Sequence, residues 1–215
     1  MIEVNSFKEL SARARHLAAQ GRRILGITGA PGAGKSTLAA AIIAELDGQA
    51  VDVPMDGFHL ANSELDRLGR RGRKGAPDTF DAAAYVSLVQ RVRADDDEIV
   101  YAPAFRRELD EPIAGAIAIP RTVPLVVTEG NYLLLDYLPW AALRGLLDEV
   151  WYLELSDRTR NQRLVDRHVR YGKSLQAARE WVEGSDESNA SLVAETRNHA
   201  DVIVTGWTTE LGGDG

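Results

Sequence analysis

The chain of 215 residues contains no cysteine and no long run of apolar residues. Without cysteine, a disulfide, a thiolate nucleophile and a cysteine-bound zinc are all excluded. The longest run without a charged residue extends only from Ile24 to Gly34, whereas a membrane-spanning helix needs about 20 apolar residues. The first residues carry charges in place of the apolar core of a secretory signal. We therefore expect a cytoplasmic protein without a membrane partner.

Basic residues are in the minority, since 25 lysines and arginines stand against 32 acidic residues and leave a net charge of −7. A nucleic-acid partner usually requires a basic surface, so this charge argues against one. Apolar residues make up 45% of the chain, which is enough for a buried core and excludes global disorder. The length fits a single domain over residues 1–215.

Short apolar segments alternate with amphipathic ones along the chain. The apolar segments predict strands at 24–28, 50–53, 99–105, 125–128, 150–155 and 202–204. The amphipathic segments predict helices at 7–18, 35–46, 60–68, 81–93, 157–171, 174–183 and 187–197, with an exposed loop at 68–79. This alternation is typical of a doubly wound parallel α/β sheet, in which ligands bind at the carboxyl ends of the strands.

The first strand ends in a glycine-rich pattern, G-x-x-x-x-G-K-S. The pattern and the residue after it comprise Gly29, Ala30, Pro31, Gly32, Ala33, Gly34, Lys35, Ser36 and Thr37. The glycines permit backbone angles that point successive amides into one concavity, and the next helix directs its positive end there. Lys35 can then reach the β and γ phosphates, and Ser36 can offer its hydroxyl to Mg²⁺. The pattern predicts a nucleoside triphosphate site.

Carboxylates follow two of the other predicted strands. Asp56 lies three residues past the second strand, and Glu129 lies at the end of the strand 125–128. Phosphoryl transfer needs a metal and a carboxylate that accepts the proton of the attacking hydroxyl. We assign Asp56 as this base and Glu129 as a Mg²⁺ ligand. In the alternative interpretation, Asp56 caps a turn and Glu129 pairs with a surface arginine.

Histidine roles are less defined by the sequence. His59 either bonds a substrate hydroxyl or packs behind Asp56, and the sequence does not favour one over the other. The remaining histidines, His16, His168 and His199, are interpreted as surface or packing residues, because none has a partner set for metal binding.

Basic side chains gather in two places. Arg160, Arg163, Arg167 and Arg170 are spaced so that they share one face of a predicted helix. Such a helix could close its guanidinium groups over a triphosphate, or the face could be solvated charge, and both interpretations stay open. The second cluster comprises Arg67, Arg70, Arg71, Arg73 and Lys74. It either holds an anionic part of an acceptor or is loop charge, which its pattern favours.

These motifs, in this order, resemble the P-loop metabolite kinases, the group that contains uridine kinase, phosphoribulokinase and bacterial pantothenate kinase. The resemblance rests on the P-loop, Asp56-Gly57-Phe58, Lys74 to Asp81, Ala102 to Phe105 and Glu129-Gly130-Asn131. It extends over about residues 22–205. The series of motifs as a whole is most similar to a small bacterial subgroup usually labelled nucleoside/nucleotide kinase-like or fructose-transport-system kinase-like.

The resemblance implies a P-loop kinase fold, ATP as phosphoryl donor, Mg²⁺ as cofactor and a hydroxyl of a small molecule as acceptor. It implies Asp56 as base, Glu129 near the metal, and Arg163 and Arg167 as lid residues that act with Lys35. We expect an N-terminal helix within 1–21, an acceptor-side insertion at 57–120 and lid helices at 157–184. The expected acceptor contacts are Phe58, His59, Lys74, Arg106 and Asn131.

The acceptor and the assembly state stay open. The segment Ala102–Arg107 lacks the Tyr and His of pantothenate kinase, and His59 stands where uridine kinase has a Tyr. The main alternative to a kinase is a nucleotide-dependent switch or partner-binding NTPase without a small acceptor. A GTPase would carry Asn-Lys-x-Asp, and the nearest match, Asn198 to Asp201, lacks the Lys. The sequence leaves a homodimer open.

Overall fold

The computed structural model describes residues 2–207, which form a six-stranded sheet in the order β1-β8-β7-β2-β6-β3. The strands are β1 (Ile2–Val4), β2 (Arg23–Gly29), β3 (Ala50–Asp52), β6 (Leu125–Glu129), β7 (Glu149–Glu154) and β8 (Val202–Thr205). Neighbouring strands run parallel throughout this sheet. The predicted doubly wound parallel α/β sheet is confirmed.

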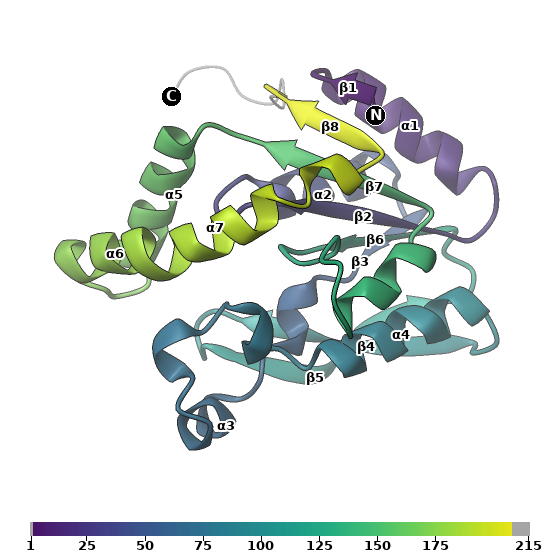
Figure 1. Ribbon diagram of the computed structural model, residues 1–215. Helices are drawn as coiled ribbons and strands as arrows, with labels where there is room; N and C mark the ends of the chain where they lie inside the picture. The colour runs from purple at the N-terminus through teal and green to yellow at the C-terminus, as the bar shows by residue number, and fades with distance from the viewer. Residues whose placement is uncertain (1, 208–215) are drawn as a thin grey trace.

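Helices cover both faces of the sheet (Figure 1). They are α1 (Phe7–Ala18), α2 (Lys35–Glu45), α3 (Asn62–Arg67), α4 (Ala82–Ala94), α5 (Asp157–Arg170), α6 (Leu175–Trp181) and α7 (Glu187–Ala194). One apolar core lies under α1 and α2, and a second lies under α4. This double coverage explains why every residue of β6 is buried. No helix within residues 2–207 is long and apolar enough to cross a bilayer.

A separate two-stranded antiparallel sheet pairs β4 (Ile99–Arg106) with β5 (Glu111–Pro120). The sequence predicted the first of these strands and missed the second. The prolines and the glycine within 111–120 act as breaker signals and obscure the alternation of its isoleucines. The strand β1 was missed as well, because three residues are too few for a periodic pattern. The segment 1–21 therefore holds a strand in addition to the expected helix.

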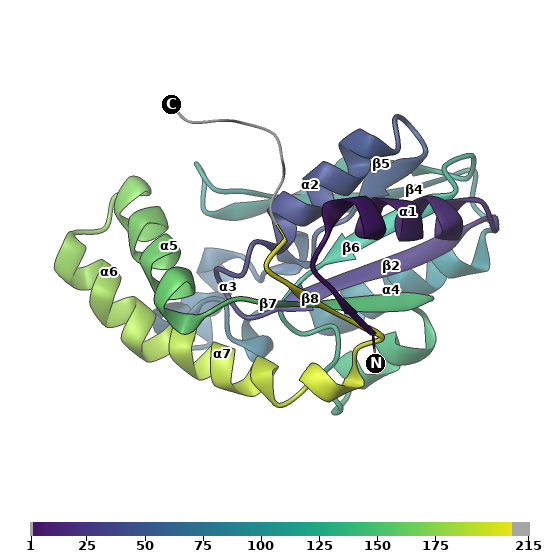
Figure 2. The same cartoon turned by 90° about the horizontal axis from the view of Figure 1, so that it is seen from above.

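The helices α5 and α6 lie beyond the carboxyl end of β7, and α7 runs back from α6 towards the start of β8 (Figure 1, Figure 2). Between α6 and α7 the chain forms a π-helical turn, η5 (Val182–Asp186). The predicted helix 187–197 was therefore too long, since α7 ends at Ala194 and a short 3-10 turn follows. These helices form one wall above the carboxyl edge of the sheet, and the chain between β3 and β5 forms the opposite wall.

Arg160 fixes α5 to the rest of the molecule. Its side chain is 1% exposed. Its guanidinium donates hydrogen bonds to the backbone oxygen of Pro31 at 3.3 Å, the carboxylate of Asp157 at 3.1 Å and that of Glu187 at 2.8 Å. One buried cation thus joins the glycine-rich loop, α5 and α7. Of the four arginines predicted to share a helix face, this one has a structural role.

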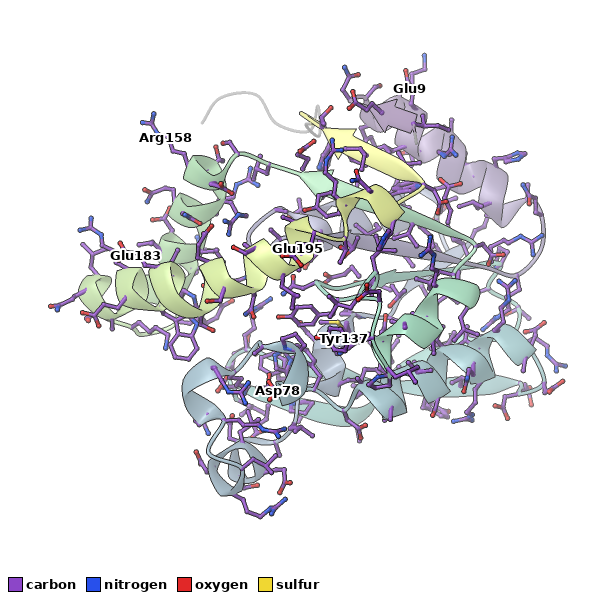
Figure 3. All side chains as sticks on the ribbon, viewed as in Figure 1. Glu9, Asp78, Tyr137, Arg158, Glu183 and Glu195 are labelled. Carbon is purple, nitrogen blue, oxygen red and sulfur yellow. The ribbon has the colours of Figure 1, made fainter. Side chains whose placement is uncertain are left out.

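Replacing Arg160 by Ala should lower the free energy of unfolding by about 2–4 kcal/mol, because Glu187 and the Pro31 carbonyl lose a buried donor. Urea denaturation followed by circular dichroism measures the change. The matched control is Arg158→Ala on the same helix, whose side chain projects away from the body of the molecule in Figure 3. The control should change stability by less than about 0.5 kcal/mol. Equal effects of the two substitutions would contradict the anchoring role.

Candidate active site

A cleft of about 590 Å³ lies at the carboxyl edge of the sheet, between the two walls. The sequence-predicted residues that line it are Pro31, Gly32, Lys35, Ser36, Asp56, His59, Lys74, Glu129, Asn131 and Arg167. These residues come from segments far apart in the chain. Parallel topology brings them together, because the carboxyl ends of the central strands meet at one edge.

Eight predicted residues lie outside the lining of this cleft: Gly29, Ala30, Ala33, Gly34, Thr37, Phe58, Arg106 and Arg163. Phe58 is buried in the core and packs on Tyr85, with the ring centroids 5.1 Å apart. Thr37 and Arg106 are exposed. The neighbour of Arg106, Arg107, lines the cleft in its place, since successive side chains at the end of a strand point in opposite directions.

The glycine-rich loop packs too tightly for side chains at two positions. A Cβ on Gly29 would lie 2.6 Å from the backbone oxygen of Leu153, and a Cβ on Gly32 would lie 2.8 Å from that of Arg160. Both glycines also have positive φ angles. The loop therefore fits between β7 and α5 only without side chains there. Its other residues complete the turn, with Ala30 and Ala33 bordering a smaller cavity of about 250 Å³ beside α7.

Lys35 begins α2 and lies inside the loop. Its ammonium donates hydrogen bonds to the backbone oxygens of Gly29 at 2.9 Å and Ala30 at 3.1 Å. Burial lowers the pKa of Lys35 to about 8, and the nearby carboxylates of Glu129 and Asp56 partly oppose this shift. The cation is thus held at the floor of the cleft without a direct carboxylate partner.

The side-chain oxygens of Ser36 and Glu129 lie together at the bottom of the cleft. The Ser36 hydroxyl donates to Glu129 Oε1 at 2.8 Å. Burial and the nearby Asp56 raise the pKa of Glu129. No group of three or more metal-binding side chains exists within residues 2–207, so the protein alone offers no complete metal cage. One hydroxyl and one or two carboxylates suit Mg²⁺, which usually takes its remaining ligands from phosphate and water.

Asp56 lies in η1 (Met55–Phe58), a 3-10 turn that follows β3. Gly57 follows Asp56 and Gly130 follows Glu129, and both glycines allow the backbone to pack closely here. A Cβ on Gly57 would lie 2.3 Å from the backbone oxygen of Pro103, and a Cβ on Gly130 would lie 2.6 Å from the Cβ of Met55. Backbone approach at these glycines brings Asp56 and Glu129 into one cleft. Glu129, which the alternative interpretation paired with a surface arginine, accepts the Ser36 hydroxyl instead.

His59 packs behind Asp56, which is one of the two roles that the sequence left open. Its Nδ1 lies 2.8 Å from the backbone oxygen of Asp56, so the ring supports the turn that carries this acid. The ring packs between Phe80 and Phe105, with centroid distances of 4.0 and 4.9 Å. Burial lowers the pKa of His59, which favours the neutral imidazole. The same ring also lines the cleft.

The basic loop after α3 divides into an exposed part and an inward part. Arg67 pairs with Glu64 on the surface, and Arg73 pairs with Asp78. Lys74 turns inward instead, with Nζ 2.7 Å from Asn62 Oδ1 and 3.0 Å from an oxygen of Asp110. The prediction of an exposed loop therefore needs correction at Lys74, whose side chain is only 9% exposed.

The arginines of α5 lie along the phosphate side of the cleft. Arg167 is largely buried in the lining, and this burial together with the nearby Arg107 lowers the pKa of Arg167. Arg163 is exposed but lies beside the glycine-rich loop, since its Nη1 is 3.5 Å from the point where a Cβ on Gly34 would lie. Unlike Arg160, neither Arg163 nor Arg167 makes an ion pair with a carboxylate within residues 2–207.

Sequence reasoning missed the pair formed by His168 and Asp186. His168 was interpreted as a surface or packing residue, yet its Nε2 lies 2.9 Å from Asp186 Oδ2 and both residues line the cleft. Trp181 packs beside the imidazole at a centroid distance of 6.2 Å. The π-helical turn η5 carries Asp186 and sets its direction, and no periodic pattern in the sequence signals that turn.

Asp52, the last residue of β3, is a half-buried acid that the sequence pattern treated as part of an apolar strand. Its Oδ1 has no hydrogen-bond partner within residues 2–207. Burial, together with the nearby Glu129, raises the pKa of Asp52 to about 7. The usable signal was an aspartate in the middle of a predicted buried strand, where a charged side chain is uncommon.

The fold and this cleft define a P-loop kinase architecture, and comparison with known proteins supports it. A Schizosaccharomyces pombe protein provisionally named uridine kinase is 33% identical over 214 residues, which cover 94% of this chain and 91% of the relative. A Leifsonia xyli pantothenate kinase is 33% identical over 113 residues, which cover 50% of this chain and 34% of that relative. No protein-family profile matches the chain.

A solved structure from Silicibacter sp. TM1040, provisionally named a fructose transport system kinase, superposes with a TM-score of 0.81. It is 36% identical, and the match covers 90% of this chain and 98% of that one. The chain therefore belongs to the P-loop metabolite kinases of the uridine kinase, phosphoribulokinase and pantothenate kinase group. P-loop kinases use ATP, usually together with Mg²⁺.

Replacing Asp52 by Asn should stabilise the protein at pH 8 by about 1–3 kcal/mol. The raised pKa means that the folded state binds more protons than the unfolded state between about pH 4 and 7, so stability falls as pH rises through this range. The amide removes this penalty, and its advantage should shrink towards pH 4. Urea unfolding at several pH values measures both the stabilisation at pH 8 and its decrease towards pH 4. A stability difference that does not depend on pH would contradict the assigned cause.

Proposed function

We propose that this protein transfers the terminal phosphoryl group of ATP to a hydroxyl of a small metabolite. The observation that carries the proposal is the meeting of Lys35, the Ser36–Glu129 pair and Asp56 in one cleft. Such an arrangement supplies phosphate binding, a metal position and a proton acceptor, which are the requirements of phosphoryl transfer. The names of the relatives refer to uridine, pantothenate and fructose transport, so membership of the group alone leaves the acceptor open.

In this proposal the amides of the glycine-rich loop and the N-terminus of α2 bind the phosphates of the nucleotide. Lys35 contributes a positive charge at the β and γ phosphates, and Arg163 and Arg167 contribute positive charge from α5. Ser36 and Glu129 would hold Mg²⁺, which when bound offsets the negative charge of the phosphate oxygens. The helices α5 and α6 act as the lid that excludes water from the cleft.

Asp56 orients the acceptor hydroxyl and accepts its proton as the hydroxyl oxygen attacks. The support from His59 matters here, because its ring contacts the backbone oxygen of the turn that carries Asp56. Asn131 and Lys74 lie on the same side of the cleft as Asp56 and would contact the acceptor. The acceptor therefore binds between η1 and the β4–β5 hairpin, opposite the lid.

A nucleotide-dependent switch without a small acceptor is the competing function. It would need the phosphate-binding loop, Ser36 and Glu129, but not a carboxylate directed at an acceptor position. An ADP-release screen over nucleosides, sugars, pantothenate and hydroxy acids, with and without Mg²⁺, separates the two functions. Release of ADP that depends on an acceptor supports a kinase, whereas release that no compound accelerates supports the switch.

Replacing Asp56 by Asn should lower kcat with the best acceptor by about 10²–10⁴-fold, because the amide cannot accept the proton. The affinity for ATP should stay nearly unchanged, since the phosphate-binding groups are untouched. Steady-state ADP release gives kcat, and isothermal titration calorimetry gives the Kd for ATP. Undiminished turnover in this variant would remove Asp56 from the role of base.

The affinity for ATP should fall by about tenfold between pH 7 and 9.5. The pKa of Lys35 is lowered to about 8, so its ammonium loses the proton over this range and no longer attracts phosphate. Calorimetry with a non-hydrolysable ATP analogue and Mg²⁺ measures the profile. The control is Arg163→Ala, which should weaken binding yet keep the same pH slope because Lys35 remains. Lys35→Ala should bind weakly at every pH, and a flat wild-type profile would exclude Lys35 as the titrating group.

A further inference from the structure

Arg107 is a cleft residue whose charge the proposed transfer does not use. It follows β4 directly and lines the cleft beside Asp56. Its Nη2 lies 3.8 Å from Asp56 Oδ2, which is an ion-pair contact but too long for a hydrogen bond. This is the one ion pair of either side chain within residues 2–207. Within residues 2–207, the guanidinium thus donates no hydrogen bond to a protein carboxylate.

The other cations on the acceptor side are already paired. Lys74 contacts Asn62 and Asp110, as described above. Arg71 lies 3.6 Å from a carboxylate oxygen of Asp110. Arg107 therefore differs from its neighbours, because it is the cation of this wall with the weakest protein partner.

A second guanidinium, that of Arg167 on the proposed lid, lines the same cleft as Arg107. The positive charge of Arg107 contributes to the lowered pKa of Arg167, so the two groups lie within electrostatic reach across the cleft. Two like charges that face a shared space repel each other, and a bound anion between them relieves this repulsion. Arg167 lies on the helix that approaches the phosphate-binding loop, whereas Arg107 lies on the hairpin beyond Asp56.

We propose that the acceptor is an anionic hydroxyl compound whose carboxylate or phosphate group binds Arg107. The inference rests on the proposed phosphoryl transfer and narrows its substrate class. An acceptor with an oxyanion near its hydroxyl engages Arg107 and Asp56 together, because these side chains are 3.8 Å apart. The oxyanion also draws Arg107 away from Asp56, which leaves the carboxylate free to accept the hydroxyl proton. Arg107 is then the residue that selects acids over neutral alcohols.

Matched pairs of compounds test this substrate class. The carboxylate pairs are glycerate with glycerol and pantothenate with pantothenyl alcohol, and the phosphate pairs are fructose 6-phosphate with fructose and uridine monophosphate with uridine. At least one acid should exceed its neutral partner by about tenfold or more in kcat/KM, because a site built for an oxyanion rejects the analogue that lacks it. The pair that responds identifies the oxyanion as carboxylate or phosphate.

Variants of Arg107 test whether this residue causes the preference for acids over neutral alcohols. Arg107→Ala should raise KM for the preferred acid by about 10–100-fold and bring the acid-to-neutral ratio of kcat/KM close to one, with KM for ATP unchanged. Arg107→Lys should restore part of the ratio, since it keeps the charge but loses the planar fork. The matched control is Arg91→Ala, which removes an exposed arginine paired with Asp97 outside the cleft and should leave the ratio intact.

Several outcomes would overturn the inference. Equal or better transfer to the neutral compounds would contradict an anionic acceptor while leaving the kinase proposal in place. An equal loss for acid and neutral acceptors in Arg107→Ala would mean that Arg107 only positions Asp56, and a raised KM for ATP would assign it to the nucleotide. If no compound of either kind accelerates ADP release, the proposed function itself fails and this inference fails with it.

Discussion

Close backbone approach at the carboxyl edge of the sheet is the constraint on which the cleft depends. Gly29 and Gly32 let the phosphate-binding loop fit between β7 and α5, and Gly57 and Gly130 let the two acids approach each other. Each of these positions would bring a Cβ within 3 Å of another backbone or core atom. The geometry of the cleft is therefore set by the absence of side chains as much as by their presence. Arg160 then locks the lid side of this arrangement in place.

The same packing produces an unusual balance of charge. Burial lowers the pKa of Lys35 and raises that of Glu129 and Asp52, so a cation and two acids are held where water solvates them poorly. Perturbed groups of this kind concentrate at functional sites, because a protein that bound no ligand there would gain no benefit from the cost in stability. A metal and a polyphosphate would complement these charges on the floor of the cleft.

The two halves of the cleft are built in different ways. In the proposed function, the phosphate-binding half relies on main-chain amides of one loop, which depend on local sequence and suit any nucleoside triphosphate. The proposed acceptor half is assembled from η1, the loop after α3 and the β4–β5 hairpin, whose side chains can change without disturbing the sheet. Relatives named for different acceptors fit this division. Arg107 lies on the variable half, which is where selectivity for an acceptor would arise.

The sequence by itself determined the alternation of strands and helices, the phosphate-binding loop and the two acids after β3 and β6, because these features depend on local spacing and on parallel topology. It did not determine which arginine of the hairpin enters the cleft, since one residue of register exchanges Arg106 for Arg107. The pairing of His168 with Asp186 and the unpartnered Oδ1 of Asp52 were not determined either, although an aspartate in an apolar strand was a signal for the latter. Those features exist only once segments distant in the chain pack together, and a π-helical turn or a missing partner leaves no periodic trace in the sequence.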